Sequence, residues 1–274
     1  MLASRVAAAV LALLGAIGAA GGNATATGSR VDRPPVAGVF DYQIGGAYRP
    51  VRAVDIVDRD RSDRPAPGRY NICYVNAFQS QPDEKHFWLS RHPHLLLRQD
   101  GQPVRDPDWP GEFLLDTSTA AHRHALAAIV GRWIDGCAEK GFDAVEPDNL
   151  DSWTRRGARG RITRADNLDL ARLLVRRAHA DGLAIAQKNA VEVSRAGAAR
   201  IGFDFAIAEE CSVYSECRGY VAAYGRHVIE IEYTDNPRSA YTRACRARGG
   251  EISIILRDRD VRPPTSSAYR YQHC

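Results

Sequence analysis

The chain has 274 residues, of which 45% are hydrophobic and 26% are charged, as in an ordinary soluble globular protein with a sizeable core. A single (β/α)8 barrel typically takes about 250 residues, so one large domain fits this length. The net charge of +4 comes from 37 basic and 33 acidic residues, which are dispersed along the sequence. Because no basic stripe interleaved with aromatic residues is present, the composition argues against a nucleic-acid-binding protein.

The first 26 residues have the pattern of a secretory signal peptide. Arg5 precedes an apolar run over 6–20, and Ala24-Thr25-Ala26 fits an A-x-A cleavage site. The run is too short, and too rich in Ala and Gly, for the roughly 20 residues of a membrane span; an uncleaved anchor is the alternative. We therefore predict a secreted protein with a signal peptide over 1–26, a lead-in segment over 27–35 and a single folded domain over 36–274.

Eight β-type runs alternate with helical patterns along this domain. The two clearest helices, over 117–140 and 163–181, each end at a glycine, and the second opens with a capping box in which Asp166 replaces the usual Glu. Strands with helical crossovers favour a (β/α)8 TIM barrel over a sandwich. An open doubly wound sheet is the alternative, but Gly45-Gly46 lacks the spacing of a dinucleotide-binding turn. The predicted strands are 39–44, 53–57, 70–76, 144–148, 183–188, 203–209, 227–233 and 251–256.

A long segment over 78–116, between the third and fourth strands, interrupts this alternation. It is rich in Pro, His, Trp and Asp, and it contains Trp109-Pro110-Gly111-Glu112. Loops of this length are usually lids or walls of binding sites. A surface excursion packed by its own aromatic residues is the alternative.

Six cysteines fit an exported protein, because an even count in an oxidising compartment usually means disulfides. Cys211 and Cys217 are close enough in sequence for one local bridge. Cys73 should point outward from its strand toward the helices, where Cys137 could meet it, provided that their Cα atoms lie within about 7 Å. We also predict the pair Cys245–Cys274. A zinc site would need C-x-x-C pairs or clustered His, so no metal is expected.

Carboxylates gather where two of the predicted strands end. The segment 142–151 reads Phe-Asp-Ala-Val-Glu-Pro-Asp-Asn-Leu-Asp, and 203–211 reads Phe-Asp-Phe-Ala-Ile-Ala-Glu-Glu-Cys. Because side chains alternate along a strand, Glu146 and Asp148 share one face, and Glu209 ends the sixth strand on the face of Ile207. Acids at one rim of a barrel lie where barrel enzymes place their chemistry. Two such carboxyl groups, one protonated and one ionised, are what glycosidic bond cleavage uses; pairing with Arg or helix capping is the alternative.

Polar side chains also end five of the other strands. Together with the two acidic ends they make seven polar ends at one rim, which are hard to explain as helix caps alone. Lys188 could form a Schiff base, as in a barrel aldolase or lyase, but the acids near it favour a charged lysine that orients a carboxylate. A Ser-His-Asp triad is not expected, since the histidines lie mostly away from the strand ends and no G-x-S-x-G elbow occurs. The polar strand ends carry Asp41, Gln43, Asp55, Asp58, Asn76, Lys188, Asn189, Glu232 and Tyr233.

With these residues the chain resembles glycoside hydrolase family 114, the endo-α-1,4-polygalactosaminidase group of (β/α)8 barrels. The most specific elements are E-P-D-N at 146–149 and E-x-C at 209–211 with Cys217. Two departures stand out: Glu210 replaces a common Gln, and the segment 76–80 lacks a Glu, which suggests an altered substrate contact. The resemblance also rests on Asp41-Tyr42-Gln43-Ile44, Cys73-Tyr74, Trp109-Pro110-Gly111-Glu112, Lys188-Asn189 and Glu232-Tyr233.

The resemblance implies hydrolysis of α-1,4-linked galactosamine polymers by two carboxylates. Asp148 of E-P-D-N corresponds to the nucleophile or base, and Glu209 to the proton donor. We expect a secreted, monomeric, endo-acting enzyme without cofactor or metal, whose partner is an amino-sugar polysaccharide rather than nucleic acid or membrane. A non-catalytic carbohydrate-binding barrel is the alternative, and the sugar's acetylation and the stereochemistry of cleavage stay open. The expected substrate-binding residues are Asp41, Gln43, Asp55, Asn76, Trp109, Glu146, Asn149, Asp151, Lys188, Glu232 and Tyr233.

Overall fold

The computed structural model describes residues 31–274. The predicted signal peptide over 1–26 and the beginning of the lead-in segment lie outside the described residues. No helix within 31–274 has the length and apolar character to cross a membrane.

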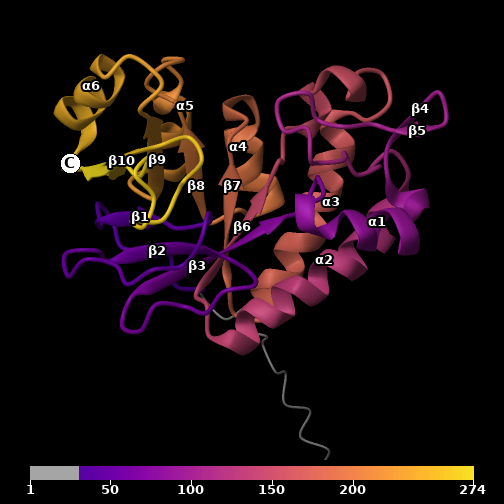
Figure 1. Ribbon diagram of the computed structural model, residues 1–274, viewed down its shortest axis with the longest axis horizontal. Coiled ribbons are helices and arrows are strands. Elements are labelled where there is room, and N and C mark those ends of the chain that lie inside the picture. Colours follow the sequence, from indigo (N-terminus) through magenta and orange to yellow (C-terminus); the bar gives the residue numbers. More distant parts are fainter. Residues whose placement is uncertain (1–30) are drawn as a thin grey trace, which may run out of the picture.

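Eight parallel strands form a barrel, as predicted, with one antiparallel strand added at its edge (Figure 1). Ser253 Oγ donates a 2.6 Å hydrogen bond to the carbonyl of Gly38, and this contact brings the last parallel strand to the first. The antiparallel β11 (Tyr271–His273) pairs with β10. The parallel strands, in their order around the barrel, are β1 (Phe40–Tyr42), β2 (Ile56–Asp60), β3 (Tyr70–Asn76), β6 (Ala144–Asp148), β7 (Ala184–Lys188), β8 (Phe205–Glu209), β9 (Val228–Tyr233) and β10 (Ser253–Arg257).

Helices cover the strands from β3 onward, whereas β1, β2 and β3 are joined by loops (Figure 1). Thr163 and Asp166 form the predicted capping box, because each side chain accepts the other residue's backbone N–H. Gly141 ends its helix at φ 87°, in the left-handed region that favours glycine. The helices are α2 (Ala120–Lys140), α3 (Arg164–Ala180), α4 (Ser194–Ala196) with the π-helical Gly197–Ile201, α5 (Cys217–Tyr224) and α6 (Ser239–Arg248).

The second strand lies three residues later than predicted. An apolar pattern placed it at 53–57, but β2 continues through Asp58 and Arg59 to Asp60. The barrel accommodates these polar residues: Asp58 points inside, and Arg59 Nε donates a 2.9 Å hydrogen bond to Gln43 outside. Asp55 therefore precedes the strand, and its carboxylate accepts a 2.9 Å hydrogen bond from the Val39 amide at the end of the barrel away from the strands' carboxyl ends. The prediction that Asp55 binds substrate is wrong.

Two apolar layers result from the alternation of side chains along the strands. One fills the barrel and includes Phe40, Ile72, Phe205, Ile229 and Ile255. The other packs the outer faces of the strands against the helices, with side chains such as Val145, Leu126 and Leu174. Because Ala144 and Ile207 belong to the inner layer, the residues two positions later, Glu146 and Glu209, also face the inside of the barrel.

The long segment 78–116 is anchored in the outer layer. Trp88 is fully buried there, together with Leu95 and Phe113. Its end turns back toward the barrel mouth, so the segment is partly core and partly wall of the cavity described below. It contains η1 (Pro82–Glu84), α1 (Lys85–Arg91), η2 (Pro93–Leu95), β4 (Arg98–Gln99) and β5 (Gln102–Pro103).

All six cysteines are paired as predicted. The Cα separations are 6.1 Å for Cys73–Cys137, 4.9 Å for Cys211–Cys217 and 5.5 Å for Cys245–Cys274. The first pair ties the outer face of β3 to α2, and the third ties α6 to the end of the chain. The second closes a short loop directly after β8.

Candidate active site

A cavity of about 860 Å³ opens at the carboxyl ends of the strands. Its lining contains nine acids against three basic residues, although the whole chain has a net charge of +4. Two aromatic side chains on different loops are exposed there, Trp109 at 46% and Tyr214 at 64%. The acids are Asp108, Glu112, Asp148, Asp151, Glu192, Glu209, Glu210, Glu216 and Asp260.

The last residues of four consecutive strands, β6 to β9, meet at the floor of this cavity: Asp148, Lys188, Glu209 and Tyr233. Lys188 is 2% exposed, and its Nζ lies 2.9 Å from Asp148 Oδ1 and 3.4 Å from Glu209 Oε2. A third carboxylate, Glu146, lies deeper in the barrel, with Oε1 at 2.7 Å from the same nitrogen. Burial alone would lower the pKa of Lys188, but Asp148, Glu146 and Glu209 raise it well above its ordinary value. A lysine kept protonated is no Schiff-base nucleophile, so the geometry opposes the aldolase or lyase alternative.

Asp148 is held as a carboxylate. Tyr74 Oη donates a 2.7 Å hydrogen bond to its Oδ2, and Lys188 binds the other oxygen. Burial would raise the pKa of Asp148, but the charge and hydrogen bond of Lys188 and the hydrogen bond of Tyr74 outweigh it and keep that pKa below its usual range. Asp148 is therefore an ionised group with one side open to the cavity.

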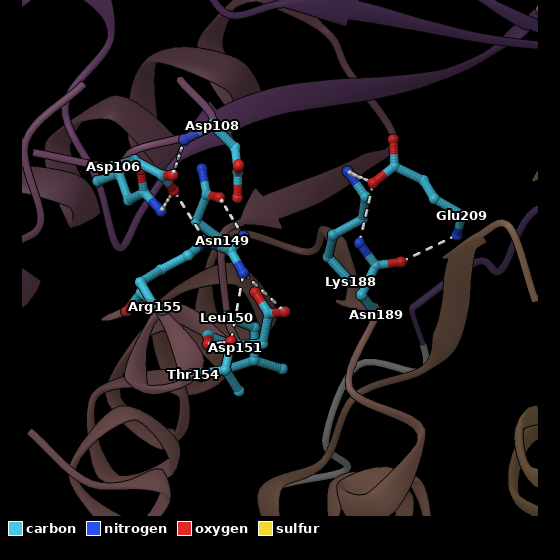
Figure 2. Close-up of polar contacts among 12 residues, drawn as sticks. Asp106, Asp108, Asn149, Leu150, Asp151, Thr154, Arg155, Lys188, Asn189 and Glu209 are labelled. Atoms are coloured by element: carbon cyan, nitrogen blue, oxygen red, sulfur yellow. Dashed lines mark hydrogen bonds and ion pairs between the residues drawn. The ribbon is translucent and has the colours of Figure 1, made fainter. Parts of the chain in front are cut away.

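Glu209 is fixed by Asn189 and Tyr233. Figure 2 shows the Asn189 amide beside Glu209: its Nδ2 donates a 2.9 Å hydrogen bond to Glu209 Oε2, and its Oδ1 accepts one of 2.9 Å from the Glu209 backbone. Tyr233 Oη donates to the other oxygen, Oε1. Asn189 makes this double contact from a left-handed backbone conformation, φ 51°, directly after β7. Glu209 is thus oriented through both carboxylate oxygens.

The separation of the two carboxylates can be bounded from Lys188. Its Nζ is 2.9 Å from Asp148 Oδ1 and 3.4 Å from Glu209 Oε2, so these two oxygens are at most about 6.3 Å apart, nearer than the roughly 6.5–9.5 Å of an inverting pair and compatible with the roughly 5–5.5 Å of a retaining one. The arrangement is suited to a nucleophile and a proton donor that act on one glycosidic bond.

The other predicted cavity residues fall into two groups. Trp109, Asn149 and Asp151 line the cavity with Lys188 and Tyr233. In Figure 2, Arg155 joins Asp106 and Asp151 on the side opposite Glu209, with Arg155–carboxylate distances of 2.8 and 3.2 Å. Glu146 and Asn76 are fully buried behind the cavity floor, so they are placed to support other side chains rather than to contact a ligand.

Asp41, Gln43 and Glu232 do not line the cavity, which contradicts their prediction as substrate contacts. Phe40 and Tyr42 take the inward positions of β1, so Asp41 faces outward and accepts hydrogen bonds from Gln43 Nε2 and Tyr48 Oη at 2.8 and 2.6 Å. These contacts hold the loop after β1. In β9 the inward positions belong to Ile231 and Tyr233. Glu232 therefore points toward the helices, where Oε1 accepts a 2.9 Å hydrogen bond from the Ser212 amide.

The segment 76–80, expected to carry an altered substrate contact, is buried. Gln79 is fully enclosed, and its Nε2 donates a 2.8 Å hydrogen bond to Asp106. The position facing the cavity from this side is Glu112, which accepts a 3.1 Å hydrogen bond from Asn76. Burial, followed by the charge of Asp148, raises the pKa of Glu112 to about 8. Sequence reasoning noted the W-P-G-E motif but did not assign this residue a role.

Glu209 and Glu210 are clearly distinguished. Glu210 adopts the left-handed backbone conformation, with φ 58°. Its Oε1 forms a 2.6 Å ion pair with Arg259, and the Arg259 guanidinium lies 4.1 Å from the centre of the Tyr233 ring. Glu210 thus braces the cavity rim, whereas Glu209 faces the barrel. Tyr74, Tyr214 and Arg259 also line the cavity. Tyr74 belongs to the Cys73-Tyr74 motif but was not predicted as a contact, and no motif named the other two.

One group within 31–274 has donor atoms close enough together to hold a metal ion: Cys211, Cys217 and Glu230. Its two cysteines form a disulfide, and Glu230 makes a 2.8 Å ion pair with Arg248. These donors are therefore committed to structural contacts.

A family model described as glycoside-hydrolase family GH114 matches residues 21–274. Among solved structures, the chain is similar to Aspergillus fumigatus Ega3 in complex with galactosamine, with 22% identity, a TM-score of 0.70 and coverage of 90% of this chain and 100% of that one. It is also similar to the glycoside hydrolase domain of PelA from Pseudomonas aeruginosa, with 16% identity, a TM-score of 0.57 and coverage of 82% and 96%. At these identities the two structures establish the fold. A search of curated proteins found no match.

Proposed function

The chain belongs to glycoside hydrolase family GH114, and on that premise we propose that it is a secreted, endo-acting hydrolase of α-1,4-linked galactosamine-type polysaccharide. The observation that carries the proposal is the placement of Asp148 and Glu209 within 3.4 Å of one buried lysine at the floor of an acidic cavity. The galactosamine bound to the similar Ega3 structure supports the choice of sugar.

We assign the nucleophile to Asp148 and the proton donor to Glu209. In the first step the Asp148 carboxylate attacks the anomeric carbon, while a protonated Glu209 gives its proton to the glycosidic oxygen as the C–O bond breaks. A glycosyl ester on Asp148 results. Water then attacks this ester, Glu209 takes the proton of the water, and both carboxyl groups return to their starting states. Two displacements at one carbon retain the configuration, in keeping with the short separation of the carboxylates.

The charge of the cavity supports a cationic substrate. Polymers of galactosamine that are not acetylated carry ammonium groups, and nine lining acids against three basic residues attract such a chain into the cavity. The exposed rings of Trp109 and Tyr214 add apolar surface against which a sugar ring can pack.

Three disulfides support the assignment to an oxidising, extracellular compartment. The alternative of a non-catalytic sugar-binding barrel rested on an altered contact near Gln79. Because Gln79 is fully buried and hydrogen-bonded to Asp106, the observation behind this alternative no longer applies.

The test is incubation of the purified protein with de-N-acetylated polygalactosamine and analysis of the products by mass spectrometry. Endo-cleavage predicts a ladder of oligomers from the earliest times. Asp148→Asn and Glu209→Gln should release none, and Glu251→Gln is the matched control, because Glu251 is an exposed acid outside the cavity that makes no ion pair within residues 31–274. Intact polymer after incubation with the wild-type protein, whatever the degree of acetylation, would refute the proposal.

A further inference from the structure

A second pair of carboxyl groups lies inside the barrel, below the proposed catalytic residues. Asp58 comes from the middle of β2 and Glu146 from β6, two residues before Asp148. Both are fully buried. The mechanism proposed above assigns neither of them a task.

Three of the four carboxyl oxygens of this pair receive no hydrogen bond from a donor within residues 31–274. Glu146 Oε1 accepts hydrogen bonds from Tyr42 Oη at 3.0 Å and from Lys188 at 2.7 Å. Its second oxygen, Oε2, and both oxygens of Asp58 receive none from residues 31–274. The strand register places Asp58 level with Ile72 and Ala144, two residues before Glu146, and a hydrogen bond between the two carboxyl groups contributes to the pKa shift of each. Such a contact between two carboxyl groups requires a proton, and two buried carboxylates without one would lose several kcal/mol of solvation with no compensating hydrogen bond.

We propose that Asp58 and Glu146 form a buried proton-binding site that holds one proton, and that Asp58, as the neutral acid, donates it to Glu146 Oε2. Asp58 is then a positioning residue for the catalytic pair. That the site holds a proton follows from the burial and the contacts of the two groups, whereas its role in turnover rests on the proposed function.

The surrounding charges place this proton on Asp58. Burial, followed by the charge of Glu146, raises the pKa of Asp58 well above its ordinary value. Burial also raises the pKa of Glu146, but Lys188 and the hydrogen bond from Asp58 oppose this rise. The titratable groups that act on the pair from the neighbouring strands are Tyr42 on β1, Asp148 on β6 and Lys188 on β7.

The proton matters because Lys188 contacts three carboxyl groups, those of Glu146, Asp148 and Glu209. With a hydrogen bond from Asp58, Glu146 stays ionised and anchors Lys188 from below at 2.7 Å, while the same ammonium reaches Asp148 at 2.9 Å. Without that donor, Glu146 would itself take up the proton, and Lys188 would lose its anchor. A displaced lysine no longer holds Asp148 in line for attack, and a misplacement of about 1 Å can cost about a hundredfold in rate.

Infrared spectroscopy tests the occupancy of the site independently of activity, because a protonated carboxyl group has a C=O stretching band that a carboxylate lacks. The spectra are taken at pH 7, and Glu112→Gln identifies the overlapping band of Glu112, whose pKa is about 8. We expect an acid band that remains in Glu112→Gln and decreases in Asp58→Asn. A wild type without this band, or a band that persists unchanged in Asp58→Asn, overturns the proposal.

Kinetics test the positioning role with two variants of one residue. Asp58→Asn keeps an N–H donor for Glu146, whereas Asp58→Leu removes it, so Asp58→Asn should be at least tenfold more active than Asp58→Leu on the same polymer. Equal losses in two folded variants would overturn the positioning role. If Asp58→Leu does not fold, a kcat of Asp58→Asn more than a hundredfold below that of the wild type would overturn it instead. Absence of hydrolysis by the wild type would refute the proposed function and leave the infrared result intact.

Discussion

Replacement of Lys188 by Met is the perturbation whose consequences follow most fully from the structure. Met keeps the length of the side chain and removes the charge that Glu146, Asp148 and Glu209 share at 2.7, 2.9 and 3.4 Å. Removal of one partner from a buried ion pair costs about 3–5 kcal/mol. At about 2–4 °C per kcal/mol for a domain of this size, the melting temperature should fall by roughly 10 °C at neutral pH.

The pH dependence of the variant should also change sign. In the wild type the pKa of Asp148 lies below its usual range, so Asp148 contributes stability at neutral pH that is lost as the pH falls through this low value. In Lys188→Met, only the hydrogen bonds from Tyr74 and the Asn149 backbone still oppose burial, so the pKa of Asp148 should rise and the variant should lose stability as the pH rises through it. The acid limb of kcat/KM should move to higher pH for the same reason.

Thermal melts at pH 5 and 8, together with a pH profile of kcat/KM, measure both effects. The chain has only three lysines, and Lys85→Met on the exposed face of α1 is the matched control. A Lys188→Met variant with the wild-type melting temperature at pH 8 and an unmoved acid limb would refute the reasoning.

Three further predictions follow from the site and the disulfides. Asp148→Asn and Glu209→Gln should each lower kcat by about 10²–10⁴-fold. Glu209→Gln should melt close to the wild type, whereas Asp148→Asn should melt lower, because it removes a charged partner of the buried Lys188. Glu210→Gln should lose its ion pair with Arg259 but keep most of its activity; the reverse ranking of Glu209→Gln and Glu210→Gln in activity would move the proton donor by one residue. Glu112→Gln should melt at a higher temperature than the wild type at pH 9, and the increase should be smaller at pH 5. The reason is that the wild-type carboxyl group, with a pKa of about 8 in the folded state, becomes progressively destabilising as the pH rises above its unfolded value of 4.5. An equal increase in melting temperature at both pH values would contradict this. Loss of the Cys73–Cys137 disulfide, which spans 64 residues, should lower the free energy of unfolding by about 4 kcal/mol by chain entropy. Loss of Cys211–Cys217, which spans 6 residues, should lower it by about 2 kcal/mol. Denaturant unfolding of the two paired Ala variants measures both, and equal losses would show that loop length does not decide the difference.

The alternation of side chains explains which parts of the site were predictable from sequence. In β6 and β8 the inward face is set by apolar residues such as Ala144 and Ile207, so Glu146, Asp148 and Glu209 could be placed inside the barrel. In β1, apolar and polar residues alternate over only three positions, Phe40–Tyr42, and nothing local shows which face is inward. The structure places Tyr42 inside, which leaves Asp41 outside.

Long-range contacts explain why the other parts of the site could not be predicted from sequence. Glu112 reaches Asn76 across 36 residues and Asp106 reaches Gln79 across 27, and no local pattern predicts how the long segment folds back onto the barrel. The shift of β2 has a similar origin, since Asp58 and Arg59 are tolerated in a strand only because partners from β6 and the loop after β1 surround them. The disulfides were predictable because strand direction and sequence separation limit the partners of each cysteine.

Proton NMR of the reducing ends formed during the first minutes of the reaction tests most directly the claim that Asp148 and Glu209 together hydrolyse an α-linked galactosamine polymer. The number of new reducing ends reports hydrolysis, and their initial configuration reports how the two carboxyl groups act. We predict that α-anomers appear first and mutarotate later, with no signal in Asp148→Asn. Initial β-anomers, or no reducing ends from the wild-type protein, would contradict the claim.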